Sequence, residues 1–338
     1  MPKVEDFERF VFIVGAPRSG TTTMSRMLQA HPQIAFPFVK EPHFFAQHDL
    51  RGLSATALKQ RVEKDYLGHF FTDAEPGRTV GFDGSVSYLY VPEQLEPVLK
   101  LWPDSRFIVG VRDPLTLLPS LHKRLIFTGD ETITRFEDAW AAIPERAAGR
   151  RIPRSAIDPR WLRYDQAPRY AHYVERLYSA VGRDRCVVVV FDDLIADPAG
   201  QHRRILEFAG LAPMPPIDLP KQRESQGVRY PWLQRLLKRP PKALLPYLAG
   251  IELRRRFRKA SGQEGTKGAA AQFLSIRKRI LRWNKSDDPD RPIPPAVQQE
   301  IRAEFKDEVE RLGALIGRDL GHWLQPRAGS SSDASPYE

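Results

Sequence analysis

The sequence predicts an α/β fold of the P-loop type: three layers, with a central parallel sheet flanked by helices, followed by a helical C-terminal region. Two observations favour this fold. Apolar runs alternate with amphipathic helical patterns, as they do in repeated βαβ units. The first apolar run ends in a glycine-framed loop, Gly15 to Gly20, and a helical pattern begins directly after it. A strand, a glycine-framed turn and a helix in this order form the layout of a phosphate-binding loop.

Each apolar run of strand length is expected to add one strand to the sheet. The run at 186–191 is the most hydrophobic of them, which favours a central position. The expected strands are 10–14, 33–36, 79–83, 106–111 and 186–191. The expected helices are 20–30, 55–71, 92–101, 114–126, 169–181, 232–238, 244–259, 273–283 and 296–316. The last helix carries a regular apolar stripe from Val297 to Ile316.

The chain is expected to form a single domain over 1–326, followed by a disordered tail at 327–338. Within the domain, the irregular stretch 128–168 is expected to be an insertion or a lid over the site. A basic helical region is expected at 230–285. Hydrophobic residues make up 41% of the 338 residues and charged residues 28%, which is a globular balance.

The net charge of +10 is concentrated in one part of the chain. Lys and Arg crowd the stretch 233–285, where only Glu252 and Glu264 oppose them. A polyanionic small molecule, an anionic membrane or a nucleic acid could match such a charge. Aromatic residues interleaved as in RNA-binding motifs are absent, so no nucleic acid partner is expected. Peripheral membrane contact through 233–285 stays open.

Sequence features also bear on the compartment. No stretch reaches the length of a membrane span, and the first residues show no signal-peptide pattern. Cys186 is the sole cysteine, so no intrachain disulfide can form. A cytoplasmic location is therefore expected. The sequence predicts no oligomeric state.

The loop differs from a nucleotide triphosphate loop at one position. Gly15 and Gly20 have the Walker A spacing, but Thr21 stands where the lysine is expected, and Arg18 is the strong cation of the loop. The backbone amides of Ser19, Gly20, Thr21 and Thr22 are expected to hold a phosphate at the start of a helix. The alternative is a tight turn without a ligand.

With Pro17 to Thr22, the chain resembles the sulfotransferases that use 3′-phosphoadenosine 5′-phosphosulfate (PAPS), whose 5′-phosphosulfate loop reads similarly. Arg112-Asp113-Pro114 with Ser120, eight residues after Arg112, resembles the second signature of that family. The resemblance implies that Arg112 and Ser120 bind the 3′-phosphate of the nucleotide. Taken alone, Arg112 could be a surface ion-pair residue and Ser120 a solvated helix serine.

The segment Lys40-Glu41-Pro42-His43-Phe44-Phe45 is similar to a motif of the heparan-sulfate-type sulfotransferases. The resemblance implies that Glu41 is the general base and that His43 assists or holds it. Ala46 stands where those enzymes often carry Asp. The alternative is a surface pair of Lys40 with Glu41, beside two core phenylalanines.

Weaker matches extend the resemblance to about residues 10–325. They are Gly81 to Tyr88, with Asp83 near an acidic position of the family, the stretch Phe191 to Pro198, and Gly317 to Trp323. The family's basic nucleotide loop near the C-terminus is not recognisable in this chain.

The resemblance implies a soluble bacterial sulfotransferase that moves a sulfuryl group from PAPS to a hydroxyl or, as second choice, an amine. The acceptor class stays open between a small molecule, a glycan and a lipid. Glu41 would act as base, and Arg18 would stabilise the leaving 5′-phosphate. No metal is expected. The main alternative is a P-loop kinase, because the apolar run before Asp193 mimics a Walker B strand. A non-enzymatic module that binds nucleic acid or membrane is the second.

Overall fold

The computed structural model describes residues 2–72, 77–217, 227–239, 269–286 and 292–326. The expected helix at 244–259 and the expected tail at 327–338 lie outside these residues. Packing divides the chain into two compact units. The first comprises Met1–Leu117, Ala167–Pro220 and Gln299–Glu338, and the second comprises Leu118–Gln166 and Lys221–Gln298.

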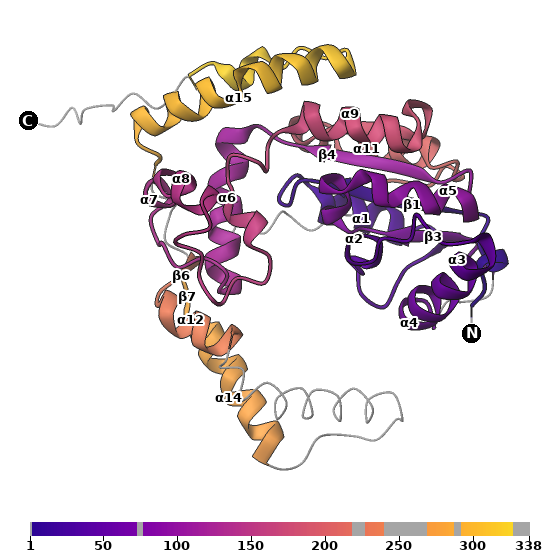
Figure 1. Ribbon diagram of the computed structural model, residues 1–338, viewed down its shortest axis with the longest axis horizontal. Helices are drawn as coiled ribbons and strands as arrows, with labels where there is room; N and C mark the ends of the chain where they lie inside the picture. The colour runs from indigo at the N-terminus through magenta and orange to yellow at the C-terminus, as the bar shows by residue number, and fades with distance from the viewer. Residues whose placement is uncertain (1, 73–76, 218–226, 240–268, 287–291, 327–338) are drawn as a thin grey trace, which may run out of the picture. The chain divides into compact units, whose positions relative to one another are not determined.

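The first unit contains a five-stranded parallel sheet with the order β2-β3-β1-β4-β5, surrounded by helices (Figure 1). The predicted fold class is therefore confirmed. The strands are β1 (Arg9–Gly15), β2 (Ile34–Ala35), β3 (Val80–Asp83), β4 (Arg106–Val111) and β5 (Cys186–Val190). Because all five run in parallel, their carboxyl ends meet at one edge of the sheet, where ligands bind in open α/β folds.

The sequence predicted a central position for the most hydrophobic strand, and this prediction is wrong. That strand, β5, lies at the end of the sheet order and pairs only with β4. On one face, Val187 and Val189 pack in the aliphatic cluster with residues of α10 (Phe191–Ala196) and α11 (Pro198–Phe208). On the other face, Val188 and Val190 are also buried. A continuous apolar run indicates that both faces of a strand are buried. It does not indicate whether the strand has one neighbour in the sheet or two.

The helices of the first unit match the sequence pattern with local differences. A π-helical turn, Glu63–Leu67, divides the helix expected at 55–71. A 3-10 turn, Pro92–Leu95, opens the next helix. The remaining helices are α1 (Thr21–Gln29), α2 (Phe44–Gln47), α3 (Ala55–Val62), α4 (Gly68–Phe70), α5 (Glu96–Leu101), α9 (Tyr170–Val181) and α15 (Pro295–Ile316), whose first residues belong to the second unit.

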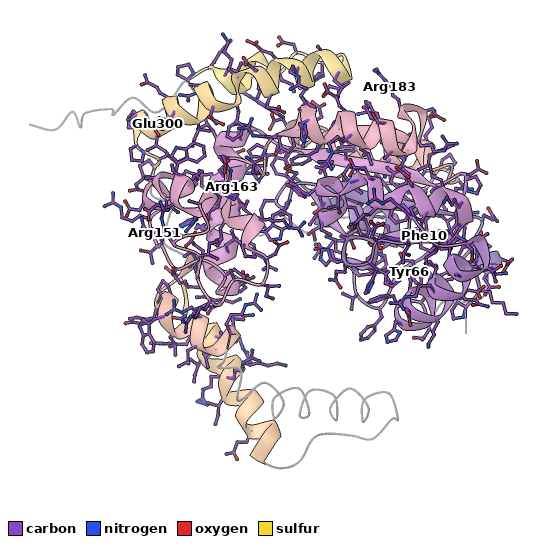
Figure 2. The ribbon with its side chains drawn as sticks, viewed as in Figure 1. Phe10, Tyr66, Arg151, Arg163, Arg183 and Glu300 are labelled. Atoms are coloured by element: carbon purple, nitrogen blue, oxygen red, sulfur yellow. The ribbon has the colours of Figure 1, made fainter. Side chains whose placement is uncertain are left out.

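The two faces of the sheet are buried in different cores. On one face, Phe10 packs its ring against Trp102 at 4.2 Å and Tyr66 at 5.9 Å between centroids (Figure 2). On the other face, Ile13 joins an aliphatic cluster with Met24 and other residues of α1 and α11. Strands alternate their side chains between faces, so β1 serves both cores. This double burial fixes the end of β1, from which the glycine-framed loop starts.

The second unit is helical. Its helices are α6 (Pro114–Thr128), whose first residues belong to the first unit, α7 (Phe136–Ala141), α8 (Ile143–Ala147), α12 (Pro231–Lys238) and α14 (Ala269–Trp283). Gly227–Val228 (β6) pairs antiparallel with Lys285–Ser286 (β7). The stretch 128–168, expected to be irregular, contains α7 and α8. It is anchored by a buried ion pair between Arg146 and Glu131 at 2.7 Å.

Candidate active site

The glycine-framed loop connects the end of β1 to the start of α1. Gly15 has φ +144°, and a Cβ there would lie 2.6 Å from the carbonyl oxygen of Gly110. Gly20 has φ +78°, and Arg18 is a non-glycine residue with φ +75°. Left-handed residues of this kind turn successive amides toward one point and form a concave anion site. The loop therefore has the backbone shape that binding of a phosphate requires.

Two buried hydroxyls beside this loop have no hydrogen-bond partner among the described residues. They belong to Ser19, which is 1% exposed, and to Tyr170 of α9, also 1% exposed. Burial raises the pKa of Tyr170, against the opposing effect of Ser19 and Arg112, so the phenol keeps its proton. Most buried polar groups are paired in native structures, so an orphaned pair at an anion-binding loop indicates a polar ligand. These residues fit a phosphate group.

Arg112 joins the loop from the end of β4. Its Nη1 donates to the carbonyl oxygen of Arg18 at 2.9 Å, and its Nε donates to Thr116 Oγ1 at 2.9 Å. The guanidinium carbon lies 4.3 Å from the centroid of the Phe191 ring. Hydrogen bonds and ring stacking hold the guanidinium in one orientation. The structure therefore brings the predicted residues Arg18 and Arg112 together.

Ser120 lies on α6, within the second unit. Its neighbours Pro119 and Lys123 line a cavity of about 430 Å³, together with His122, Arg229 and other residues of this unit. The charged lining residues are Lys123, Arg135, Arg229 and Glu137, so the wall carries more positive than negative charge. The role of Ser120 stays a prediction.

Glu41 and His43 follow β2 and lie next to each other. Lys40 Nζ donates to Glu41 Oε1 at 2.6 Å, and His43 Nε2 lies 3.5 Å from Glu41 Oε2. The Glu41 side chain is 33% exposed. Burial disfavours its charged form, but the hydrogen bond of His43 and the charge of Lys40 outweigh burial and lower its pKa to about 2. Glu41 is therefore a half-buried carboxylate, ionised at neutral pH.

The backbone and the ring of His43 are each held by a serine. His43 has φ +55°, and its N–H donates to Ser85 Oγ at 2.8 Å. Its Nδ1 lies 2.7 Å from Ser87 Oγ. Both serines follow β3, the neighbour of β2 in the sheet. Sheet topology thus brings together two short sequence segments that carry the candidate base.

Asp83, at the end of β3, holds Ser85 in place. Its Oδ1 accepts hydrogen bonds from the N–H and hydroxyl of Ser85 at 2.9 and 2.5 Å. Its Oδ2 accepts from the hydroxyls of Tyr66 and Tyr88 at 2.9 and 2.8 Å. Burial raises the pKa of Asp83 to about 6 against these four hydrogen bonds. Asp83 is fully buried, which indicates a structural carboxylate.

Two residues of this site could not be assigned from the sequence. Ser87 lay within the quoted stretch Gly81 to Tyr88 without a role of its own. Tyr170 lay in a predicted helix, and nothing in its local pattern distinguished it from a core tyrosine. The signal that could have identified Ser87 is its place directly after a strand, at the ligand edge of the sheet.

Comparison with known proteins identifies the family of the chain. The model of the Sulfotransferase family matches residues 11–80 and 75–216. The chain belongs to the sulfotransferase family. Protein-tyrosine sulfotransferase 2 of Gallus gallus is 25% identical over 205 residues, which cover 60% of this chain and 51% of that protein. Heparan sulfate glucosamine 3-O-sulfotransferase 3B1 of Mus musculus is 26% identical over 201 residues, 59% of this chain and 45% of that protein.

This sulfotransferase chain spans about half the length of the curated relatives it matches. A crystal structure of a sulfotransferase from Alicyclobacillus acidocaldarius shares its fold, with a TM-score of 0.60 and 23% identity over 93% of this chain and 98% of that one. Among the described residues, no helix is long and apolar enough to span a membrane. The same residues contain no group of three or more His, Cys, Asp or Glu placed to hold a metal ion.

Proposed function

We propose that the chain transfers a sulfuryl group from PAPS to an acceptor hydroxyl or, as second choice, an amine. The observation that carries the proposal is the anion-binding loop without a Walker lysine, next to two orphaned buried hydroxyls. PAPS supplies a sulfuryl group on a 5′-phosphate leaving group. Such a donor has no γ-phosphate, so its binding does not need the Walker lysine. It does need backbone amides and hydroxyls around the 5′-phosphate.

The loop would hold the 5′-phosphate. The amides of Gly20, Thr21 and Thr22 lie at the start of α1, where the helix dipole favours a negative charge. The Ser19 amide donates to the Ala16 carbonyl at 3.3 Å, so Ser19 would contribute its hydroxyl. Arg18 would stabilise the charge that grows on this phosphate. Arg112 would bind the 3′-phosphate, and its bond to the Arg18 carbonyl would keep the loop in shape.

Glu41 would accept the proton of the acceptor as the new bond to sulfur forms. Its lowered pKa keeps it ionised, and its one-third exposure leaves it accessible to an acceptor. His43 and Lys40 would hold the carboxylate in place. The names of the relatives refer to protein tyrosine and to 3-O-sulfation of heparan sulfate glucosamine, which favours a hydroxyl acceptor. The proposal leaves this hydroxyl open between a glycan, a lipid and a small molecule.

The test is a transfer assay with sulfur-labelled PAPS, a chelator and panels of glycans, lipids and phenols. We expect label on at least one acceptor class with the wild-type chain, and a large loss with Glu41→Gln. Transfer of phosphate from ATP that requires magnesium, without any sulfur transfer, would overturn the proposal.

A P-loop kinase is disfavoured by the contacts of the acidic residues that follow β5. Asp192 Oδ2 accepts from Trp323 Nε1 at 2.8 Å, and Asp193 pairs with Arg318 at 2.5 Å. Both carboxylates are therefore occupied by the C-terminal part of the first unit. A Walker B aspartate is instead directed to a magnesium ion at the phosphates.

We further propose a peripheral contact of the second unit with anionic membranes, within the stretch 233–285 and its flank. Trp232 and Leu236 lie one turn apart on α12, and both are more than half exposed. Gln234, between them in the sequence, is buried, and its side-chain amide donates to the Phe127 carbonyl oxygen. On α14, Trp283 is 55% exposed and stacks on Tyr230 at 5.6 Å.

Cations accompany these exposed apolar side chains on both helices and directly after them. The described ones are Arg235, Lys238, Arg239, Arg277, Lys278, Arg279, Arg282 and Lys285. Apolar side chains flanked by cations suit an anionic lipid surface. Vesicles containing phosphatidylserine should sediment the chain at low salt, and Trp232→Ser should weaken this binding. Equal sedimentation with neutral vesicles, or none at low salt, would exclude the contact. A peripheral protein with one cysteine also fits the cytoplasmic location that we propose.

A further inference from the structure

The hydroxyl of Ser87 occupies one nitrogen of the His43 ring. Ser87 Oγ lies 2.7 Å from Nδ1, while the other nitrogen, Nε2, lies 3.5 Å from Glu41 Oε2. Ser87 is 9% exposed, whereas the His43 side chain is 32% exposed. The imidazole thus bridges a buried hydroxyl and the candidate base.

The two neighbours decide which ring nitrogen carries the proton. A carboxylate can only accept hydrogen bonds, whereas a serine hydroxyl can donate or accept. The nitrogen that faces Glu41 is therefore favoured as the N–H. In the neutral ring the other nitrogen then carries the lone pair, and Ser87 donates to it. The partner of one nitrogen sets the tautomer of the other.

The support beneath Ser87 is rigid. Ser87 belongs to the 3-10 turn Val86–Tyr90, which begins directly after Ser85. Ser85 holds the His43 backbone and is itself held by Asp83 through two hydrogen bonds. The ring and the backbone of His43 are thus fixed from one short segment, which is anchored in the core by the Asp83 carboxylate.

We propose that Ser87 is a positioning residue that holds the His43 ring with Nε2 toward Glu41, and that Glu41 thereby fixes the proton on Nε2. The imidazole then donates to Glu41 and has no lone pair available for the acceptor, so Glu41 alone takes the proton. The inference builds on the proposed sulfuryl transfer, and it goes beyond that proposal by separating the roles of two adjacent candidate bases.

The first measurement is the protonation of the His43 ring nitrogens by long-range proton–nitrogen NMR, in the wild-type chain and in Ser87→Ala. We expect the proton on Nε2 in the wild type and a mixture of both tautomers in Ser87→Ala, because a ring that Ser87 no longer holds can also turn Nδ1 toward Glu41. Ser87→Thr keeps the hydroxyl and should restore the wild-type tautomer. This measurement requires neither donor nor acceptor.

The second measurement is turnover in the labelled-PAPS assay. Ser87→Ala should lower turnover about tenfold, the effect of one neutral hydrogen bond, with unchanged affinity for adenosine 3′,5′-bisphosphate. Ser87→Thr should recover most of it. A wild-type proton on Nδ1, or an Ala variant with unchanged tautomer and turnover, would overturn the inference. Absence of sulfuryl transfer from the wild type would overturn the proposed function, while the ring measurement would still decide the position of the proton.

Discussion

Glu41 follows β2 and Asp83 ends the neighbouring strand β3, but their carboxylates are held in opposite ways. Asp83 is fully buried and accepts four hydrogen bonds from the core, and burial raises its pKa to about 6. Glu41 is one-third exposed, has Lys40 and His43 as neighbours, and has a pKa of about 2. A carboxylate whose oxygens accept all their hydrogen bonds from buried groups stabilises the fold, whereas one that stays accessible is available for chemistry.

The largest expected effect is a loss of turnover when Glu41, but not a control carboxylate, is replaced. Glu41→Gln keeps the shape of the side chain but removes the proton acceptor, so turnover should fall by about 10²–10⁴-fold. Initial rates with labelled PAPS measure this loss. Glu5→Gln is the matched control, because Glu5 pairs with Lys59 on the surface of the same unit. Retention of most of the turnover in Glu41→Gln would remove Glu41 as the base.

The next largest effect is a loss of folding stability when Asp83 is replaced. Asp83→Ala leaves the hydroxyls of Tyr66, Tyr88 and Ser85 without their acceptor, so the free energy of unfolding should fall by about 3 kcal/mol. Urea denaturation measures it. Asp49→Ala, which removes an exposed partner of Arg51, should change the free energy by less than about 0.5 kcal/mol. Equal losses in both variants would contradict the structural role of Asp83.

The pH dependence of stability should have opposite signs at the two sites. The pKa of Asp83 is raised by folding, so its contribution is fully present below its ordinary pKa of 3.8 and is lost as the pH rises through about 6. The pKa of Glu41 is lowered, so its contribution is present above 4.5 and is lost as the pH falls toward about 2.

Unfolding free energies of the wild type, Asp83→Asn and Glu41→Gln across these pH ranges measure both contributions. The difference between wild type and Asp83→Asn should shrink as the pH rises, and the difference between wild type and Glu41→Gln should shrink as the pH falls. Slopes of the same sign would show that the two carboxylates do not differ as described.

The smallest effect concerns the neighbour of Glu41. Lys40→Gln removes the ammonium from Glu41 Oε1, so the pKa of Glu41 should rise from about 2 toward its ordinary value of 4.5. The acid limb of the pH–rate profile should move to higher pH, with stability changed by less than about 1 kcal/mol. Lys59→Gln, which breaks an exposed pair, is the control. An unmoved acid limb would show that Lys40 does not set this pKa.

The sequence predicted features that depend on local pattern. The strand at 106–111 was predicted at its observed bounds, and the loop from Gly15 to Gly20 was recognised. Both predictions depend only on glycine spacing and on apolar runs, which can be read from residues adjacent in the sequence. The pairing of Glu41 with His43 also follows from their separation by two residues.

Contacts between distant segments were not predictable in this way. Ser87 and His43 are 44 positions apart, and they meet only because β2 and β3 are neighbours in the sheet. Tyr170 reaches the loop from a helix far along the chain. The two-residue strands β6 and β7 are too short for any periodic signal, as are the helical turns of α7 and α8.

The most direct test of the central claim is calorimetric titration with adenosine 3′,5′-bisphosphate in the presence of a chelator, which requires no knowledge of the acceptor. The wild-type chain should bind it without metal, Arg112→Ala should bind it at least about tenfold more weakly, and Glu41→Gln should bind it as the wild type does. The absence of binding, or binding of ATP only with magnesium, would contradict the account.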